Sequence, residues 1–474
     1  MQEYERYDAL GLAELVRKGE VSPDELLDAA LARVSRHNPR LNAVVMSWEE
    51  RARREIRAGL PDGPFRGVPF LLKDLHAQVA GERLTYGSRL FEKFVSDTDS
   101  ELVLRYRRAG LVIFGRTASP EFGLTATTES VLFGATRNPW NPERSSGGSS
   151  GGASAAVAAG ILPAAHASDG GGSIRIPAAS CGLVGLKPSR ARVPMGPHVG
   201  EGWGGMSTAH VVSRSLRDTA ALLDATHGPD LGTPYFAPEP ERAYLDECSR
   251  APGRLRIAVQ TTAFNGVDTH PECAAAARDA ARLCESLGHD IVDATLEVDR
   301  EALARAVTIL IGSNVAATVE DAARAQGREV DGRIVEAITL AMVQGARGST
   351  AADYARSVRT LHTAGRRVAR FFENVDVLIT PTMAQPTPRI GELALEQTPS
   401  AAYGARLGAS TGYTSLFNSA GNPALSLPLG RASDGMPLGV QFAARAGDEA
   451  TLFRLGAQVE KARPWFGVRP PGVG

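Results

Sequence analysis

Two glycine-rich segments contain serines that are candidates for nucleophilic chemistry. Residues 147–152 read Gly-Gly-Ser-Ser-Gly-Gly, and residues 169–173 read Asp-Gly-Gly-Gly-Ser. Consecutive glycines let successive backbone N–H groups point at one place, which is how an oxyanion hole binds a tetrahedral intermediate. Ser173 is therefore a candidate nucleophile. The first segment alone is equally typical of a turn or linker, and the second matches neither a phosphate-binding loop nor the serine elbow of α/β-hydrolases.

A nucleophilic serine needs a base, and Lys73 is the preferred candidate. It follows the apolar run 68–72, so we expect it to be desolvated, which lowers a lysine pKa and leaves some neutral amine near pH 7. The chain has only five lysines among its 52 Lys and Arg residues, so a lysine in an apolar setting is informative. A surface ion pair between Lys73 and Asp74 is the alternative. His166 and His76 lie nearby in sequence, but neither stands in a recognisable triad.

The composition indicates a globular protein. The chain has 474 residues, 43% hydrophobic and 22% charged, with a formal net charge of −1, so no overall field favours nucleic acid or an anionic membrane. We find no run of 18 apolar residues and no signal-like N-terminus, and we expect no membrane or nucleic-acid partner. The four cysteines lack metal-ligand spacing. We expect them to be reduced, in a cytoplasmic protein without a metal or cofactor.

Alternating strand and helix patterns predict an α/β fold with a mainly parallel sheet. A capping box at Ser22 begins a helix that extends to about residue 35. Strands are predicted at 68–72, 111–115, 252–259, 375–379, 425–428 and 438–442, and helices at 99–109, 153–160, 271–287, 298–345, 350–372 and 447–461. The 298–345 stretch is interpreted as a helical insertion or cap.

Several motifs together resemble the amidase signature family. They run in the family's order over nearly the whole chain, and stretches 123–142 and 201–224 are most similar to the branch that hydrolyses aminohexanoate cyclic dimers. The motifs are Gly67-Val68-Pro69 with Lys73-Asp74, residues 138–141, 147–152, 169–177 and 181–188, Ser213-Arg214-Ser215 with Arg217-Asp218, Thr380-Pro381-Thr382, and Asn418 with Gly421, Pro423 and Ala424.

The resemblance implies a residue-by-residue mechanism. Lys73 matches the general base, Ser149 the bridging serine after a usually cis peptide bond, and Ser173 the nucleophile that forms an acyl-enzyme. The family's oxyanion donors match the backbone N–H groups of Gly170, Gly171, Gly172 and Ser173. Asp169 and Arg175 match the pair that stiffens this loop, and Ser150 is expected to support it. The substrate pocket is expected to include Gly123, Leu124 and Thr125.

The implied protein is a single amidase signature domain, residues 1–474, with a mixed, mainly parallel sheet covered by helices on both faces. It would hydrolyse a linear or cyclic carboxylic amide, with a small-molecule amide as its substrate; a homodimer is compatible with the sequence. An amidotransferase subunit and a non-catalytic binding protein stay open as alternatives. One departure is Gly170, where the family commonly carries a side chain. We expect this glycine to leave space beside the acyl group for a wider or cyclic substrate.

Overall fold

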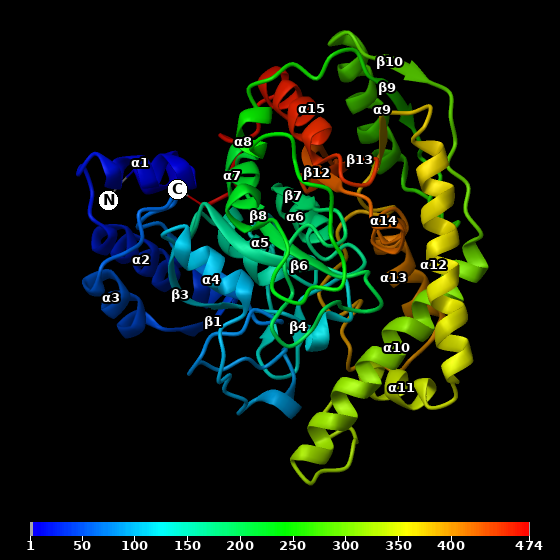
Figure 1. Ribbon diagram of the computed structural model, residues 1–474, viewed down its shortest axis with the longest axis horizontal. Helices are drawn as coiled ribbons and strands as arrows, with labels where there is room; N and C mark the ends of the chain where they lie inside the picture. Colours follow the sequence, from blue (N-terminus) through cyan, green and yellow to red (C-terminus); the bar gives the residue numbers. More distant parts are fainter. Residues whose placement is uncertain (1–2, 474) are drawn as a thin grey trace.

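The computed structural model describes residues 3–473, and a large β-sheet runs through the middle of the molecule (Figure 1). Eight strands form it in the order β10-β9-β11-β13-β12-β7-β8-β6. Their bounds are Asp290–Val292, Arg256–Val259, Val377–Pro381, Pro437–Ala444, Ala424–Arg431, Val184–Lys187, Thr208–Ser213 and Ala164–Asp169. Strand β6, which ends at Asp169, therefore lies at one edge of this sheet.

The sheet is mixed, as predicted, but it is not mainly parallel. Only the pairings of β9 with β10 and with β11 are parallel, whereas β11–β13, β13–β12, β12–β7, β7–β8 and β8–β6 are antiparallel. The prediction assumed that each helix returns the chain to a parallel strand. Strands β12 and β13 instead follow each other directly as a hairpin, and β7 precedes β8 with no helix between them.

Helices cover both faces of this sheet, as predicted. In β11, Val377 and Ile379 pack into a core shared with α9 (Pro271–Ser286) and α15 (Glu449–Ala462). The intervening Leu378 packs on the opposite side with residues of α12 (Ala351–Phe371) and α14 (Ser415–Ala420). This alternation follows from the two-residue repeat of a strand, and it explains why the strand is apolar throughout.

A second, three-stranded sheet carries Lys73. Its order is β1-β3-β2, with bounds Val44–Ser47, Val112–Thr117 and Pro69–Lys73. All five residues of β2 are buried. The backbone N–H of Lys73 donates to Nδ1 of His166 on β6 at 3.1 Å, so the C-terminal end of β2 meets the edge of the large sheet.

The remaining elements surround these two sheets. The predicted capping box is present at the start of α2, where Ser22 and Glu25 exchange hydrogen bonds. The other elements are α1 (Ala9–Arg17), α2 (Pro23–Leu41), α3 (Glu49–Ala58), α4 (Glu101–Arg108), α5 (Gly151–Ala158), α6 (Arg175–Cys181), α7 (Leu216–Thr226), α8 (Tyr244–Glu247), α13 (Ala401–Thr411), the short helices η1 (Tyr4–Arg6), η2 (Arg89–Phe91) and η3 (Glu121–Gly123), and the small strands β4 (Glu129–Ser130) and β5 (Gly134–Ala135).

The predicted helical insertion consists of two helices, α10 (Arg300–Ala325) and α11 (Ala337–Ala346). They lie with α12 at one side of the molecule, away from the N-terminal helices (Figure 1). By length and composition alone, α10 is apolar enough to cross a membrane, with a mean hydropathy of 1.5 over its best window. The sequence shows no unbroken run of 18 strongly apolar residues here, because alanine, glycine and threonine lie among the isoleucines, leucines and valines of this helix. In the structure α10 packs against α11 and α12.

Candidate active site

Lys73 and Ser149 form a buried hydrogen-bonded pair where the two sheets meet. The ammonium nitrogen Nζ of Lys73 lies 2.7 Å from Oγ of Ser149 and 3.0 Å from Oγ of Ser168. Burial is the main cause that lowers the pKa of Lys73 to about 7, and the nearby carboxylate of Asp169 only partly opposes it. No surface pair with Asp74 forms, because that carboxylate accepts hydrogen bonds from Thr85. Lys73 is thus a buried amine that titrates near neutrality.

The segment of Ser149 is a tight turn rather than a linker. The Gly148–Ser149 peptide bond is cis, as the resemblance implies. A side chain at Gly148 would meet the backbone of Thr127 at 2.3 Å, so glycine is required there. Ser150 has the supporting position expected for it, since its backbone N–H donates to the carbonyl of Ser173 at 3.2 Å. Its hydroxyl also bonds to the backbone of Ser168.

Ser173 ends the loop that follows β6. Its side chain is partly accessible, and its hydroxyl forms no hydrogen bond within residues 3–473. The N–H groups of Gly170, Gly171 and Ser173 likewise donate to no group in that part of the chain. Gly172 departs from the prediction, because its N–H donates to Oδ1 of Asp169 at 2.7 Å. The expected oxyanion donors are therefore reduced to the N–H groups of Gly170, Gly171 and Ser173.

A buried ion pair between Asp169 and Arg175 holds this loop in place. Arg175 contacts both carboxylate oxygens of Asp169 at 2.9 Å, in a bidentate pair. Burial alone would raise the pKa of Asp169, but the Arg175 guanidinium holds it well below its usual range. The other Arg175 bonds reach C-terminal elements, at 2.6 Å to Asn418 of α14 and 2.7 Å to Gln441 of β13. The loop conformation is thus anchored by residues far apart in sequence.

Two cavities meet at Ser173. The first, here called the helical cavity, has a volume of about 380 Å³. Its walls come from the Ser173 loop and from α10, α11, α13 and α14. They are mainly apolar and include Ile176, Leu303, Val307, Ile311, Met342, Leu407 and Leu416. Residues of α10 and α11, within the 298–345 stretch, therefore border the site.

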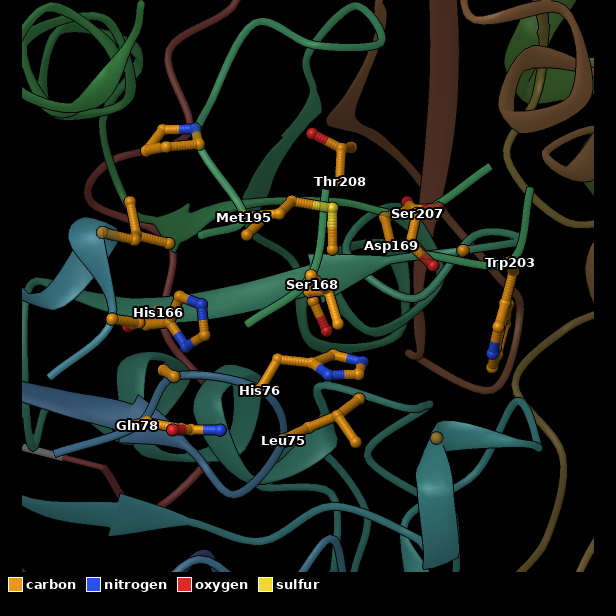
Figure 2. A pocket seen from close by; sticks show the side chains of 18 of the residues that line it. Leu75, His76, Gln78, His166, Ser168, Asp169, Met195, Trp203, Ser207 and Thr208 are labelled. Atoms are coloured by element: carbon orange, nitrogen blue, oxygen red, sulfur yellow. The ribbon is translucent and has the colours of Figure 1, made fainter. Parts of the chain in front are cut away.

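The second cavity, here called the relay cavity, has a volume of about 90 Å³ and lies on the side of Lys73 and Ser149. Ser149 and Ser168 line it but do not line the helical cavity. Figure 2 shows this cavity, with Ser168 and the His76 ring near its centre and Trp203 at its far side. Gly123, Gly170, Ser173 and Trp203 line both cavities, so the two adjoin at these residues.

The predicted pocket residues divide between these cavities. Leu124 and Thr125 line only the helical cavity, whereas Gly123 lines both. A side chain on Gly123 would approach Ser149 Oγ at 3.0 Å. The interpretation of Gly170 is wrong: the space that a side chain would take there is occupied by the Trp203 ring, whose carbons lie 2.6 Å from the position of an added Cβ.

Two contributing residues, Ser168 and Trp203, were missed in the sequence. Ser168 is the second hydrogen-bond partner of Lys73, and its only sequence signal is its place before Asp169. Trp203 lies among four glycines, Gly200, Gly202, Gly204 and Gly205, which mark a loop with special backbone geometry. His166 is no base for Ser173. Its Nδ1 accepts the Lys73 N–H, and burial holds its pKa far below the usual value.

Comparisons with known proteins show the family to which the chain belongs. The family model described as amidase matches residues 25–453. The chain is 43% identical to the 6-aminohexanoate-cyclic-dimer hydrolase of Paenarthrobacter ureafaciens, over 98% of this chain and 96% of that protein. It is 36% identical to the putative amidase AmiC of Mycobacterium tuberculosis, again over 98% of this chain and 96% of that protein.

Solved structures give the same result. A 6-aminohexanoate cyclic dimer hydrolase complexed with its substrate superposes with a TM-score of 0.94 at 41% identity, covering 99% of this chain and all of that one. A bacterial aryl acylamidase of the amidase signature family superposes with a TM-score of 0.87 at 26% identity, covering 97% of both chains. The likeness thus extends over nearly the whole chain.

Proposed function

The chain belongs to the amidase family and hydrolyses amide bonds, and we propose that it does so through an acyl-enzyme on Ser173. The observation that carries this proposal is the buried contact of Lys73 with Ser149, 2.7 Å long, beside a serine loop with three free N–H groups. A buried amine that is partly neutral near pH 7 is a competent general base.

The proposed steps move one proton along two serines. Neutral Lys73 takes the hydroxyl proton of Ser149, Ser149 takes that of Ser173, and Ser173 Oγ forms a bond to the amide carbon. The carbonyl oxygen becomes an oxyanion that accepts hydrogen bonds from the free N–H groups of the loop. The proton then returns through Ser149 to the amide nitrogen, the C–N bond breaks, and the amine leaves. Water repeats the sequence on the ester and releases the carboxylic acid.

We propose that the substrate is an uncharged aliphatic amide with methylene chains, of the 6-aminohexanoate cyclic-dimer type. The helical cavity supports this, because aliphatic side chains of α10, α11, α13 and α14 dominate its lining. Its volume of about 380 Å³ lies within the range of small-molecule sites. The 43% identity to a hydrolase of that cyclic dimer supports the same substrate class.

A panel of three amides tests this proposal. We expect the highest kcat/KM for the 6-aminohexanoate cyclic dimer, less for the linear dimer, whose terminal charges would be desolvated in the cavity, and least for an anilide. Released amine is measured for wild type and Ser173→Ala, and a fluorophosphonate probe reports whether Ser173 is nucleophilic. A preference for the anilide would contradict the substrate class. An active Ser173→Ala variant would contradict the mechanism.

We further propose that the enzyme acts in the cytoplasm. Its four cysteines are all free, and three of them are buried, which fits a reducing compartment. Subcellular fractionation of the native host tests this, and recovery of the enzyme outside the cytoplasm would contradict it.

A further inference from the structure

The two cavities differ in whether Ser149, the relay serine, lines them. Ser173 lines both, but Ser149 lines only the relay cavity. In the proposed reaction Ser149 returns a proton to the amide nitrogen, so this nitrogen must lie within hydrogen-bond reach of Ser149. The nitrogen side of the scissile bond therefore faces the relay cavity, and the acyl side faces the helical cavity.

His76 is one of the polar groups of the relay cavity that have no hydrogen-bond partner among residues 3–473; the hydroxyls of Ser100 and Thr208 are two others. Its ring points into the cavity between Ser168 and Leu75 (Figure 2). It meets the ring of Tyr86 edge-on, with centroids 5.8 Å apart, and forms no hydrogen bond with any residue from 3 to 473. His166, by contrast, accepts a backbone N–H, and His210 contacts the carbonyl of Thr219. His76 is exposed and lines the cavity, so a molecule that enters the cavity can reach its ring.

The His76 imidazole is neutral in the working enzyme. His76 is exposed where it lines the cavity, but desolvation of its ring by the surrounding protein, and then the charge of nearby Lys73, lower its pKa to about 4. A neutral imidazole has one donor and one acceptor nitrogen. It can therefore accept a hydrogen bond from an N–H group without competing with Lys73 for the relayed proton.

The size and walls of the relay cavity limit what can bind beside His76. Its volume is about 90 Å³, which is below the roughly 150 Å³ of a cavity that encloses a benzene ring. Apolar side chains of Leu75, Leu102 and Met195 supply much of the lining. The cavity thus suits a short, unbranched alkyl chain with one hydrogen-bonding group, rather than an aryl or branched amine.

We propose that the relay cavity is the leaving-amine subsite and that His76 selects the amine by accepting a hydrogen bond from an N–H group of the amine. The inference rests on the acyl-enzyme mechanism proposed above and adds its amine specificity. Attack of an added amine on the acyl-enzyme is the reverse of the step that releases the leaving amine. An attacking amine must therefore bind in the same subsite. Amine capture of the acyl-enzyme therefore measures this subsite separately from the acyl side.

The test is an acyl-transfer experiment. The enzyme is acylated with the phenyl ester of hexanoic acid, and added methylamine, butylamine or benzylamine competes with water for the acyl-enzyme. We expect methylamine and butylamine to give saturable amide formation and benzylamine to give little. In His76→Ala, and in His76→Gly, which suits the positive φ of 63° at this position, the butylamine concentration for half-maximal transfer should rise roughly tenfold.

Controls separate the subsite from the mechanism. Val307→Ala, in the helical cavity, should change the preference among acyl donors but not the butylamine concentration for half-maximal transfer. His76→Asn keeps an acceptor and tolerates the same backbone conformation, so it should restore part of the transfer. Wild-type amine capture in all three His76 variants overturns the inference. Absence of an acylated Ser173 by mass spectrometry in the wild type overturns the mechanism instead.

Discussion

The Trp203 ring lies directly over Gly170, in the space that any other residue at position 170 would claim. An added Cβ would lie 2.6 Å from two ring carbons, and Trp203 itself has a positive φ of 54°. The glycine therefore admits the indole, and Trp203 lines both cavities. The departure from the family's usual residue at position 170 is explained by a packing partner rather than by a wider site.

This contact predicts that Gly170→Ala is destabilising. The methyl group must displace the indole, and overpacking of this kind costs about 1–3 kcal/mol. Gly171→Ala is the matched control, because nothing lies within 4 Å of an added Cβ there, and we expect its free energy of unfolding to change by less than about 0.5 kcal/mol. Urea unfolding of both variants measures the difference. Equal stability of the two variants would show that the indole moves aside freely.

The activity should depend on pH through Lys73. Only the neutral amine can accept the serine proton, so kcat should fall about tenfold per unit below a pH of about 7 and level off above it. Lys73→Arg, which stays charged, should lose about 10²–10⁴-fold in kcat. Lys461→Arg, at an exposed position, is the control and should keep the wild-type profile. A kcat that does not change between pH 5 and 9 would contradict the role of Lys73 as the general base.

The Asp169–Arg175 pair should be essential for stability. Arg175→Lys cannot keep the bidentate contact together with the bonds to Asn418 and Gln441. Breaking a buried pair typically costs about 3–5 kcal/mol. Arg324→Lys is the control, since that side chain is 77% exposed in its pair with Asp321. Thermal and urea unfolding should separate the two variants clearly; a similar small loss in both would contradict the anchoring role.

A carboxylate pair connects the start of α11 to the wall of the site and should impose a pH dependence on stability. Oε2 of Glu121 accepts the Glu336 N–H at 2.8 Å. Burial first, and then the Glu121 charge, raise the pKa of Glu336 from 4.5 to about 8. The folded state therefore binds more protons than the unfolded state between these values, and stability should fall as pH rises from about 5 to 8, by at most about 1.4 kcal/mol per unit.

Glu336→Gln checks this pH dependence. The amide mimics the protonated acid, so this variant should lose the contribution of residue 336 to the slope of unfolding free energy against pH. Glu301→Gln changes an exposed side chain of α10 and should keep the wild-type slope. An unchanged slope in Glu336→Gln would mean that the carboxyl group titrates alike in the folded and unfolded protein.

The sequence predicts the catalytic residues better than it predicts the strands and loops that surround them. Lys73, Ser149 and Ser173 lie in local motifs whose glycines and apolar run are visible in the chain, and the structure places Lys73 beside Ser149. Strand direction was mispredicted because a buried strand has the same apolar pattern in either direction. Trp203 and His76 could not be assigned, since their places depend on which loops meet across the sheets. The Gly172 N–H was misassigned because three adjacent glycines do not reveal which amide turns toward Asp169.

Arg175 joins the loop of Ser173 to Asn418 and Gln441, about 240 and 270 positions further along the chain. A ribosome-bound chain that lacks β13 therefore has its nucleophile and its base, but the loop that binds the oxyanion is not yet held in place. Catalytic competence should arrive only near the end of synthesis, and a fragment ending before β13 should regain activity when the missing C-terminal piece is supplied separately.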